Sequence, residues 1–101
     1  MVLLMVLGVL QGDAKEVQKL LAMTSVDVNE PEQKSGNVAL HCASAKGHLE
    51  VVRALLSDPR TNPNLENLHN TTALILAAGN ANAAVVEELL RSPETNPNFE
   101  V

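Results

Sequence analysis

Aromatic side chains are almost missing from this chain, and their scarcity limits the kind of core it can build. Phe99 is the only aromatic residue among 101, and tryptophan and tyrosine are absent. Hydrophobic residues nevertheless make up 46% of the chain, which is enough for one folded domain of this length. A core of Leu, Val, Ile and Ala suits thin helical layers better than a thick sheet sandwich. The composition therefore favours helices.

Basic residues are also scarce. Seven Lys and Arg stand against twelve Asp and Glu, which gives a net charge of −5. A protein that binds the phosphate backbone needs a basic stripe, and single-strand binders also need aromatic stacking platforms. The scattered basic residues and the lack of aromatics predict that nucleic acid is not a partner.

Cysteine occurs once, at Cys42. An intrachain disulfide is therefore impossible, and no zinc site can be built on thiolates alone. This favours a cytoplasmic location. The apolar segment Met1–Leu10 points the other way, because it has the length of a signal-peptide core. No Lys or Arg precedes it, and the segment is too short to span a bilayer. We expect no membrane insertion, with a cleaved signal sequence and secretion as the alternative.

The chain repeats itself at a fixed interval. Residues 38–67 align without a gap with residues 72–101, and both copies carry A-L, V-V, L-L and T-N-P-N at matching positions. A weaker copy lies upstream at a slightly longer interval, where Gly12 matches Gly47. The offset between the two copies is 34 residues, and internal repetition with a period of this length is typical of stacked repeat proteins. We expect a single domain of three units, at about residues 1–32, 33–66 and 67–101.

Each unit has the pattern of two helices joined by a tight turn. Small side chains on the short first helix would let a neighbouring helix approach, and Gly47 supplies the left-handed geometry that reverses the chain. Apolar residues at helical spacing predict the second helix, which Asp58-Pro59 ends. Turn segments at 27–37 and 62–71 link the pairs. The defining residues are Leu40, Ala43 and Ser44, then Leu49, Val52, Leu55 and Leu56.

The stretch V-A-L-H-C-A-S-A-K-G-H-L-E-V-V-R-A-L-L, from Val38 to Leu56, resembles the ankyrin repeat. That signature is T-P-L-H-x-A, followed by G-H and a V-V-x-x-L-L stretch. The resemblance is strong in the second unit, good in the third and partial in the first. It implies an all-α, ankyrin-type solenoid of stacked helix-turn-helix units with projecting β-turn fingers. It also implies a scaffold for protein–protein interaction that binds a protein partner and is not an enzyme.

The sequence departs from this signature at three places. Val38 lacks the hydroxyl that would cap the first helix of its unit, a loss of about 0.5–2 kcal/mol. Asn80-Ala81-Asn82 replaces the Gly-His turn, and we expect Gly79 and Asn80 to supply the unusual backbone angles there. The first unit carries L-M-V-L-G-V-L in place of T-P-L-H, and we interpret residues 2–11 as its first helix.

Candidate catalytic groups all have a structural interpretation. His41 and His48 occupy the L-H and G-H positions of the resembled family, where histidine bonds to neighbouring backbone, and Cys42 is expected to be a small packed residue. The alternatives are a metal or acid–base pair and redox sensing. Glu87 and Glu88 are neighbours on a helix and point to different sides, so they form no carboxylate dyad. We therefore expect no catalytic residue, no metal and no cofactor.

Asparagine recurs in the loops. Asn29, Asn64 and Asn98 occupy the family's loop position, where the side chain typically ties the turn together. Asn70-Thr71-Thr72 fits the acceptor pattern for N-glycosylation, which would matter only in a secreted chain. Thr72 has a structural explanation as a helix cap.

The predicted binding surface combines the finger tips with the groove side of each first helix. The other positions of each unit are expected to pack against neighbouring units, so the tip and groove positions remain available to contact a partner. Leu68 is the strongest indication of a binding surface, because a leucine at a finger tip does not pack in the core. The tip residues are Lys34, Ser35, Asn37, Leu68, His69 and Thr71, and the groove residues are Leu10, Gln11, Ala45, Lys46, Gly79 and Asn80.

A second hypothesis starts from the ends of the chain. The segment Met1–Leu10 is apolar on every face, whereas a terminal repeat should present a polar outer face. We expect this segment to pack against another copy, an upstream repeat or a partner. The rival function is therefore a structural fragment of a longer ankyrin array that extends a solenoid or self-associates.

Overall fold

The structure is a computed structural model that describes residues 9–23 and 27–95. These residues form helices and loops, with no strand among them, so the all-α prediction is confirmed. Residues 9–11 make a helical turn ahead of the first full helix. The helices are α2 (Ala14–Leu21), α3 (Ala39–Lys46), α4 (Leu49–Ser57), α5 (Ala73–Gly79) and α6 (Ala83–Arg91). Residues 2–8 of the predicted first helix lie outside the described part.

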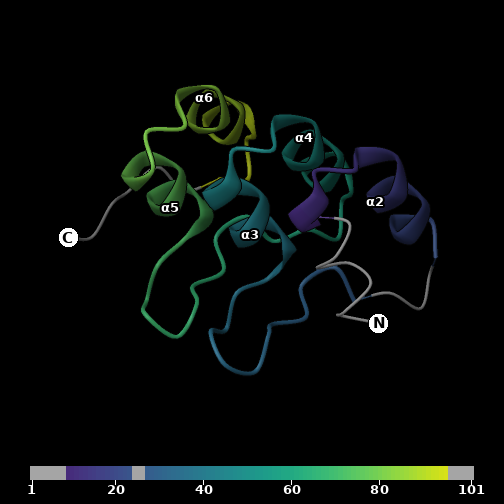
Figure 1. Cartoon of the computed structure of the whole chain (residues 1–101), viewed down its shortest axis with the longest axis horizontal. Helices are drawn as coiled ribbons and strands as arrows, with labels where there is room; N and C mark the ends of the chain where they lie inside the picture. The colour runs from purple at the N-terminus through teal and green to yellow at the C-terminus, as the bar shows by residue number, and fades with distance from the viewer. Residues whose placement is uncertain (1–8, 24–26, 96–101) are drawn as a thin grey trace.

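The helices lie in two rows. Helices α2, α4 and α6 form an outer row, and α3 and α5 continue an inner row that begins at the turn over residues 9–11 (Figure 1). Neighbours within a row pack on each other, α2 on α4, α4 on α6 and α3 on α5. The loops before α3 and α5 project from the same side of the stack (Figure 1). We call them finger one (residues 32–37) and finger two (residues 66–71). The expected stack of helix pairs with projecting fingers is confirmed.

The core is aliphatic and runs continuously through the stack. The inner helix α3 contributes small residues, and the Ala43 and Ser44 side chains are 0% exposed. The outer helices contribute the larger groups. Val17 of α2, Leu55 of α4 and Leu89 of α6 are each 0% exposed. No helix pair buries its apolar face alone, because each outer helix packs on its neighbour in the next pair.

Glycines reverse the chain between inner and outer helices for two reasons. Gly12 and Gly47 have φ of 69° and 74°, the left-handed region that an L side chain enters at a cost. A Cβ on Gly12 would also lie 2.8 Å from His48 Nδ1, and one on Gly47 would lie 3.0 Å from Asn82 Oδ1. Both the backbone angle and the next helix pair therefore require glycine.

His48 and Asn82 reach back to cap the inner helix of the preceding pair. The Nε2 of His48 lies 3.3 Å from the Leu10 carbonyl oxygen. The Nδ2 of Asn82 donates to the Ser44 carbonyl at 2.9 Å. Carbonyls at a helix C-terminus lack partners within the helix, so the turn residue of one pair satisfies the helix before it. The prediction that His48 bonds to backbone is confirmed.

In the third helix pair, the residue with the left-handed backbone conformation is not one that the sequence predicted. Gly79 is the last residue of α5, and Asn80 has φ of −98°, so the expectation that they supply the unusual angles is wrong. Ala81 adopts φ of 58° instead. The reason is register, because Ala81 holds the position in the third unit that Gly47 holds in the second. The turn survives with an alanine in a strained conformation.

Side chains of the outer loops tie each helix pair to the next. Asn29 Nδ2 donates to the Arg60 carbonyl at 2.7 Å, and Asn64 Nδ2 donates to the Glu94 carbonyl at 2.7 Å. These two asparagines thus join neighbouring loops, whereas the sequence predicted that each ties its own turn together, and Asn98 lies outside the described residues. Arg60 also donates to the Leu21 carbonyl at 2.7 Å, which adds a second link between the first two outer loops.

Candidate functional site

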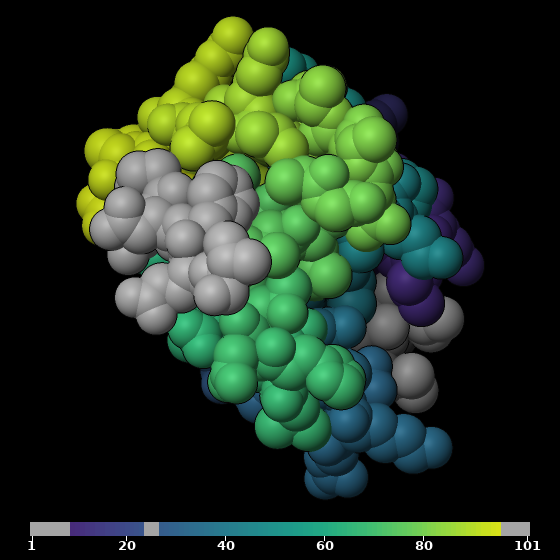
Figure 2. All heavy atoms as spheres, turned by 90° about the vertical axis from the view of Figure 1, so that its left-hand side faces the viewer, coloured from purple at the N-terminus to yellow at the C-terminus, as the bar shows by residue number. Residues whose placement is uncertain are grey.

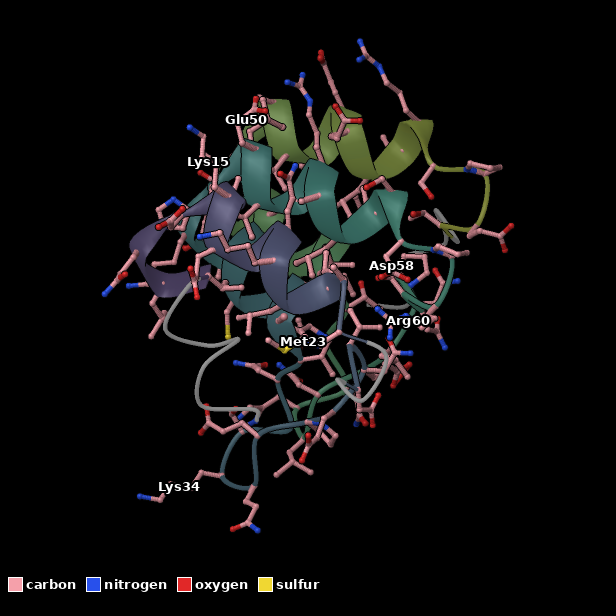
Figure 3. The ribbon with its side chains drawn as sticks, turned by 90° about the vertical axis from the view of Figure 1, so that its right-hand side faces the viewer. Lys15, Met23, Lys34, Glu50, Asp58 and Arg60 are labelled. Atoms are coloured by element: carbon pink, nitrogen blue, oxygen red, sulfur yellow. The ribbon has the colours of Figure 1, made fainter. Side chains whose placement is uncertain are left out.

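Finger one is closed by its own backbone. The Glu32 N–H donates to the Asn37 carbonyl at 2.8 Å, and the Gly36 N–H donates to the Glu32 carbonyl at 2.8 Å. Gly36 has φ of 72°, which suits glycine. The Asn37 N–H donates to Ser35 Oγ at 3.1 Å. Lys34 points away from the molecule at the end of this finger (Figure 3), so its ammonium group is free to meet a partner.

Finger two is organised by one buried side chain, Asn67, which is 9% exposed. Its Oδ1 accepts from the His69 N–H at 2.8 Å and from the Thr71 N–H at 3.1 Å. Its own backbone N–H donates to the Thr71 carbonyl at 3.0 Å. Sequence reasoning missed Asn67. The signal was available, because asparagine side chains often bond to backbone two residues on.

The two fingers are joined to each other. The Leu68 N–H donates to the Ser35 carbonyl at 2.9 Å, and Asn67 Nδ2 donates to Asn37 Oδ1 at 2.8 Å. A Cβ on Gly36 would lie 2.8 Å from the Leu68 nitrogen, so the absence of a side chain lets finger two approach. The fingers therefore form one paired surface and not two separate loops.

His41 fixes finger two to the inner helix α3. Its ring is 1% exposed. Its Nδ1 accepts from the Val38 N–H at 2.9 Å, which satisfies the backbone of the N-cap residue but does not replace the acceptor that a hydroxyl at position 38 would offer to the first turn of α3. Its Nε2 lies 2.8 Å from the Leu65 carbonyl oxygen and 3.0 Å from that of Thr71. Burial lowers the pKa of His41, against the two carbonyls, which raise it. The structural interpretation of His41 is confirmed.

Cys42 of α3 is half-buried and packs against the aliphatic core. Burial raises the pKa of its thiol, and the Glu32 carboxylate raises it further, while the Lys46 ammonium lowers it. Because the thiolate is the reactive form, this environment keeps Cys42 in its unreactive form. The geometry is that of a packed residue.

The structure divides the predicted binding residues by exposure. Exposed fractions are 65% for Leu68 and 44% for Leu10. Hydrogen bonds bring Ser35 and Asn37 of finger one together with finger two, whereas the described contacts do not join the fingers to Leu10. The exposed members are Leu10, Gln11, Lys34, Lys46, Leu68, His69, Gly79 and Asn80, and the half-buried members are Ser35, Asn37, Ala45 and Thr71.

Three of the half-buried binding candidates, Ser35, Asn37 and Thr71, also take part in hydrogen bonds that stabilise the fingers. Ser35 and Asn37 supply the acceptors that hold finger two, and the Thr71 carbonyl accepts from Asn67 and from His41. Of these three, only Asn37 bonds to the other finger through its side chain, whereas Ser35 and Thr71 contribute their backbone carbonyls. The side chains best placed for contact are therefore those of Lys34, Leu68 and His69.

The face opposite the fingers carries an ionic ridge. Arg53 of α4 donates to Glu88 of α6 at 2.9 Å and to Glu50 at 2.7 Å, and these contacts raise the pKa of Arg53. Glu87 is exposed and Glu88 half-buried, so the two carboxylates face different surroundings. Exposed pairs of this kind contribute little to stability. Figure 3 shows Lys15 and Glu50 on this outer side, far from Lys34.

Two further features bear on the kind of site. Among the residues that the structure describes, none of the helices is long and apolar enough to cross a bilayer. The same residues do not gather three or more His, Cys, Asp or Glu side chains into a cluster that could hold a metal ion.

The solved structures similar to this chain include chains from two complexes. A chain in the complex of the Bdellovibrio bacteriovorus endopeptidase Bd0816 with the immunity protein Bd3460 has a TM-score of 0.85 and 31% identity, over 97% of this chain and 49% of that one. A chain in the complex of the yeast ribosomal protein Rps3 with its chaperone Yar1 has a TM-score of 0.79 and 28% identity, over 92% of this chain and 70% of that one.

Sequence comparison agrees with the fold. The E3 ubiquitin-protein ligase KEG of Arabidopsis thaliana is 31% identical over 64 residues, which are 63% of this chain and 4% of the ligase. This chain thus spans a small part of that relative and about half of the first structural neighbour. A family profile described as ankyrin repeats, in three copies, matches residues 4–100. The chain belongs to the ankyrin-repeat family.

Proposed function

We propose that this chain is a scaffold for protein–protein interaction, and that the partner binds across the finger tips and the groove side of the inner helices. One observation carries the proposal. Leu68 is 65% exposed at the tip of a finger that is held by its own hydrogen bonds, by finger one and by His41. An exposed apolar side chain on a rigid support suits contact with a partner, because little ordering entropy opposes binding.

The exposed side of the inner helices suits a closely approaching partner. It carries the small residues Ala45 and Gly79, and a Cβ added at Gly79 would meet nothing within 4 Å. Lys46 is exposed at the end of α3, where it adds a positive charge to this side. We infer that the partner offers an apolar side chain to Leu68 and an acidic group to Lys46.

The comparisons support a protein as partner. The two solved structures described above are each complexes of two different proteins. The ankyrin fold typically binds and rarely catalyses, which favours a binding role without a cofactor. We further propose a cytoplasmic location, because the single cysteine is kept as an unreactive thiol and takes part in no disulfide.

Replacing Leu68, His69 and Lys46 together by Ala tests this surface. The wild-type chain is immobilised, proteins captured from a native extract are identified, and the same proteins are measured against the triple variant. We expect loss of capture with an unchanged melting temperature. Met23→Ala is the matched control, since Met23 is a 45% exposed apolar residue away from the fingers (Figure 3). Intact capture by the triple variant would contradict the proposal.

A second candidate function is the extension of a longer repeat array. It is favoured by the outward face of the last helix pair, which is seen from the α5 and α6 side in Figure 2. Ala78 is exposed and Val86 half-buried, whereas Ser44 and Val52, their equivalents in the preceding unit, are 0% exposed. Sedimentation velocity distinguishes the candidates. Monomeric behaviour across a hundredfold concentration range supports the scaffold, and concentration-dependent association supports the array.

A further inference from the structure

We propose that Ser92 is a phosphorylation site, and that the phosphate is received by Arg91 in the hollow between α4 and α6. The proposal concerns the outer face of the molecule, away from the proposed binding surface. It rests on the sequence around Ser92, on its backbone geometry and on the side chains that share its hollow.

The first observation is the dipeptide Ser92-Pro93. It is the only place in the 101 residues where Ser or Thr precedes Pro. Kinases that select a proline after the acceptor bind the acceptor in an extended conformation, which the residue before a proline prefers. Ser92 already has this conformation, with φ of −70° and ψ of 123°. It follows α6 and is itself half-buried, but Arg91 before it and Pro93 and Glu94 after it are exposed, so a kinase can reach the segment.

The second observation is the composition of the hollow, which has a volume of about 260 Å³. Arg53 is already held by two carboxylates, at 2.7 and 2.9 Å. Arg91 is different, because its guanidinium is 4.0 Å from Glu88 and its side chain is 70% exposed. It is therefore the cation that can turn to a new anion. The lining residues are Arg53, Leu56, Ser57, Glu88, Arg91, Ser92 and Pro93.

The third observation comes from the repeat. Asp58 is the equivalent of Ser92 in the preceding unit, and it also comes directly after an outer helix. Its carboxylate accepts from the Arg60 side chain at 2.7 and 3.0 Å, and these bonds lower the pKa of Asp58. An anion with an arginine counterion thus already occupies this position of the repeat. Glu94 stands where Arg60 would be, so the counterion for a phosphate on Ser92 is Arg91.

The reaction is an ordinary phosphoryl transfer from ATP. The Ser92 hydroxyl oxygen forms a bond to the γ-phosphorus, and the bond from that phosphorus to the β,γ-bridging oxygen breaks. ADP leaves, and the hydroxyl proton passes to the base of the kinase. The phosphate adds about −1.5 to −2 charges at pH 7. Because a helix C-terminus carries partial negative charge, this phosphate needs the guanidinium beside it.

The first test asks whether Ser92 accepts phosphate in the folded chain. A proline-directed kinase is chosen that phosphorylates a peptide copying residues 88–95, and is then given the intact chain and ATP. Intact mass should show one added phosphate on wild type and none on Ser92→Ala. Ser57→Ala is the matched control, since Ser57 lines the same hollow but precedes Asp58, and it should still gain one phosphate. An unmodified wild-type chain, or a phosphorylated Ser92→Ala variant, would overturn the proposal.

The second test asks whether Arg91 receives the phosphate. Phosphorus NMR follows the titration of the phosphoserine in the folded chain. The titration midpoint should lie about half a pH unit lower in wild type than in Arg91→Gln, because a nearby cation favours the doubly charged phosphate. Lys19→Gln removes a cation of α2, across the stack, and should leave the wild-type midpoint unchanged. Equal midpoints in wild type and Arg91→Gln would show that Arg91 does not hold the phosphate.

Discussion

His41 shows how one residue can join two repeats. Its three contacts all involve backbone groups, and they require a bare Nδ1 facing the Val38 N–H and a proton on Nε2 facing the two carbonyls of finger two. Only the neutral ring meets both conditions. A proton on Nδ1 would place two N–H donors, those of His41 and Val38, against each other, and His41 is only 1% exposed.

This predicts an acid-dependent loss of stability. The pKa of His41 is lowered from 6.5 in the folded chain, so below pH 6.5 the unfolded chain binds more protons and stability falls with the pH. The contribution of His41 is fully present above pH 6.5 and is lost as the pH falls towards its folded pKa. Denaturant unfolding between pH 8 and pH 5 should show this slope in wild type. His41→Gln should flatten it, and His69→Gln, at the exposed finger tip, should not.

Ala81 predicts a stabilising substitution. An L residue in the left-handed region costs about 1–2 kcal/mol, and Ala81 has φ of 58°. Ala81→Gly relieves this strain but adds freedom to the unfolded chain, so we expect a net gain of about 0.5–1 kcal/mol in the free energy of unfolding.

The equivalent position provides the reverse experiment. Gly47→Ala should lower the free energy of unfolding by at least about 1–2 kcal/mol, because the new methyl group would also approach Asn82 Oδ1 at 3.0 Å. Denaturant unfolding of both variants tests the pair. Effects of the same sign at the two positions would contradict this account of the turns.

Finger two is the element whose shape depends most on one side chain. Asn67→Ala removes an acceptor from two backbone N–H groups and a donor from Asn37. We expect a loss of about 1–3 kcal/mol and faster amide hydrogen exchange at His69 and Thr71. Asn67→Asp keeps the acceptor and should protect these two amides better than Asn67→Ala. Equal exchange in both variants would show that Asn67 does not organise the finger.

The helices were predictable from sequence because each follows from a local pattern. Small residues mark α3, the spacing of Leu49, Val52 and Leu55 marks α4, and Pro59 follows its end. The finger geometry was not predictable in the same way. The hydrogen bond from Asn67 to Asn37 joins two different repeats. A sequence pattern within one repeat does not predict a contact between two repeats.

The candidate site was predictable in outline. The resemblance to the ankyrin repeat placed Leu68 at a finger tip, and the structure leaves its side chain exposed. The hydrogen bonds by which Asn37 and Thr71 hold the fingers were not predicted, although a turn must satisfy its backbone groups. One expectation, that Gly79 and Asn80 supply the unusual backbone angles, was wrong for a physical reason. The strain in the last turn falls on Ala81, because register fixed the position that must reverse the chain.

At the scale of the whole molecule, the stack separates two faces. The fingers and inner helices carry Leu68, Lys34 and Lys46, while the outer helices carry the ionic ridge and Ser92. Adjacent helix pairs share buried surface and hydrogen bonds from His41, Asn29 and Asn82, so the fingers are held by the same contacts that hold the stack. The proposed binding surface is therefore largely formed in the free chain.

The central claim is that a partner protein binds on the finger side. The most direct measurement is an NMR titration of the isotope-labelled chain with a protein identified by capture. The account predicts shifts of amide signals at Lys34, Lys46, Leu68, His69 and Asn80, with signals of the outer helices α2, α4 and α6 left in place. Shifts confined to the outer helices, with the finger signals unchanged, would contradict it.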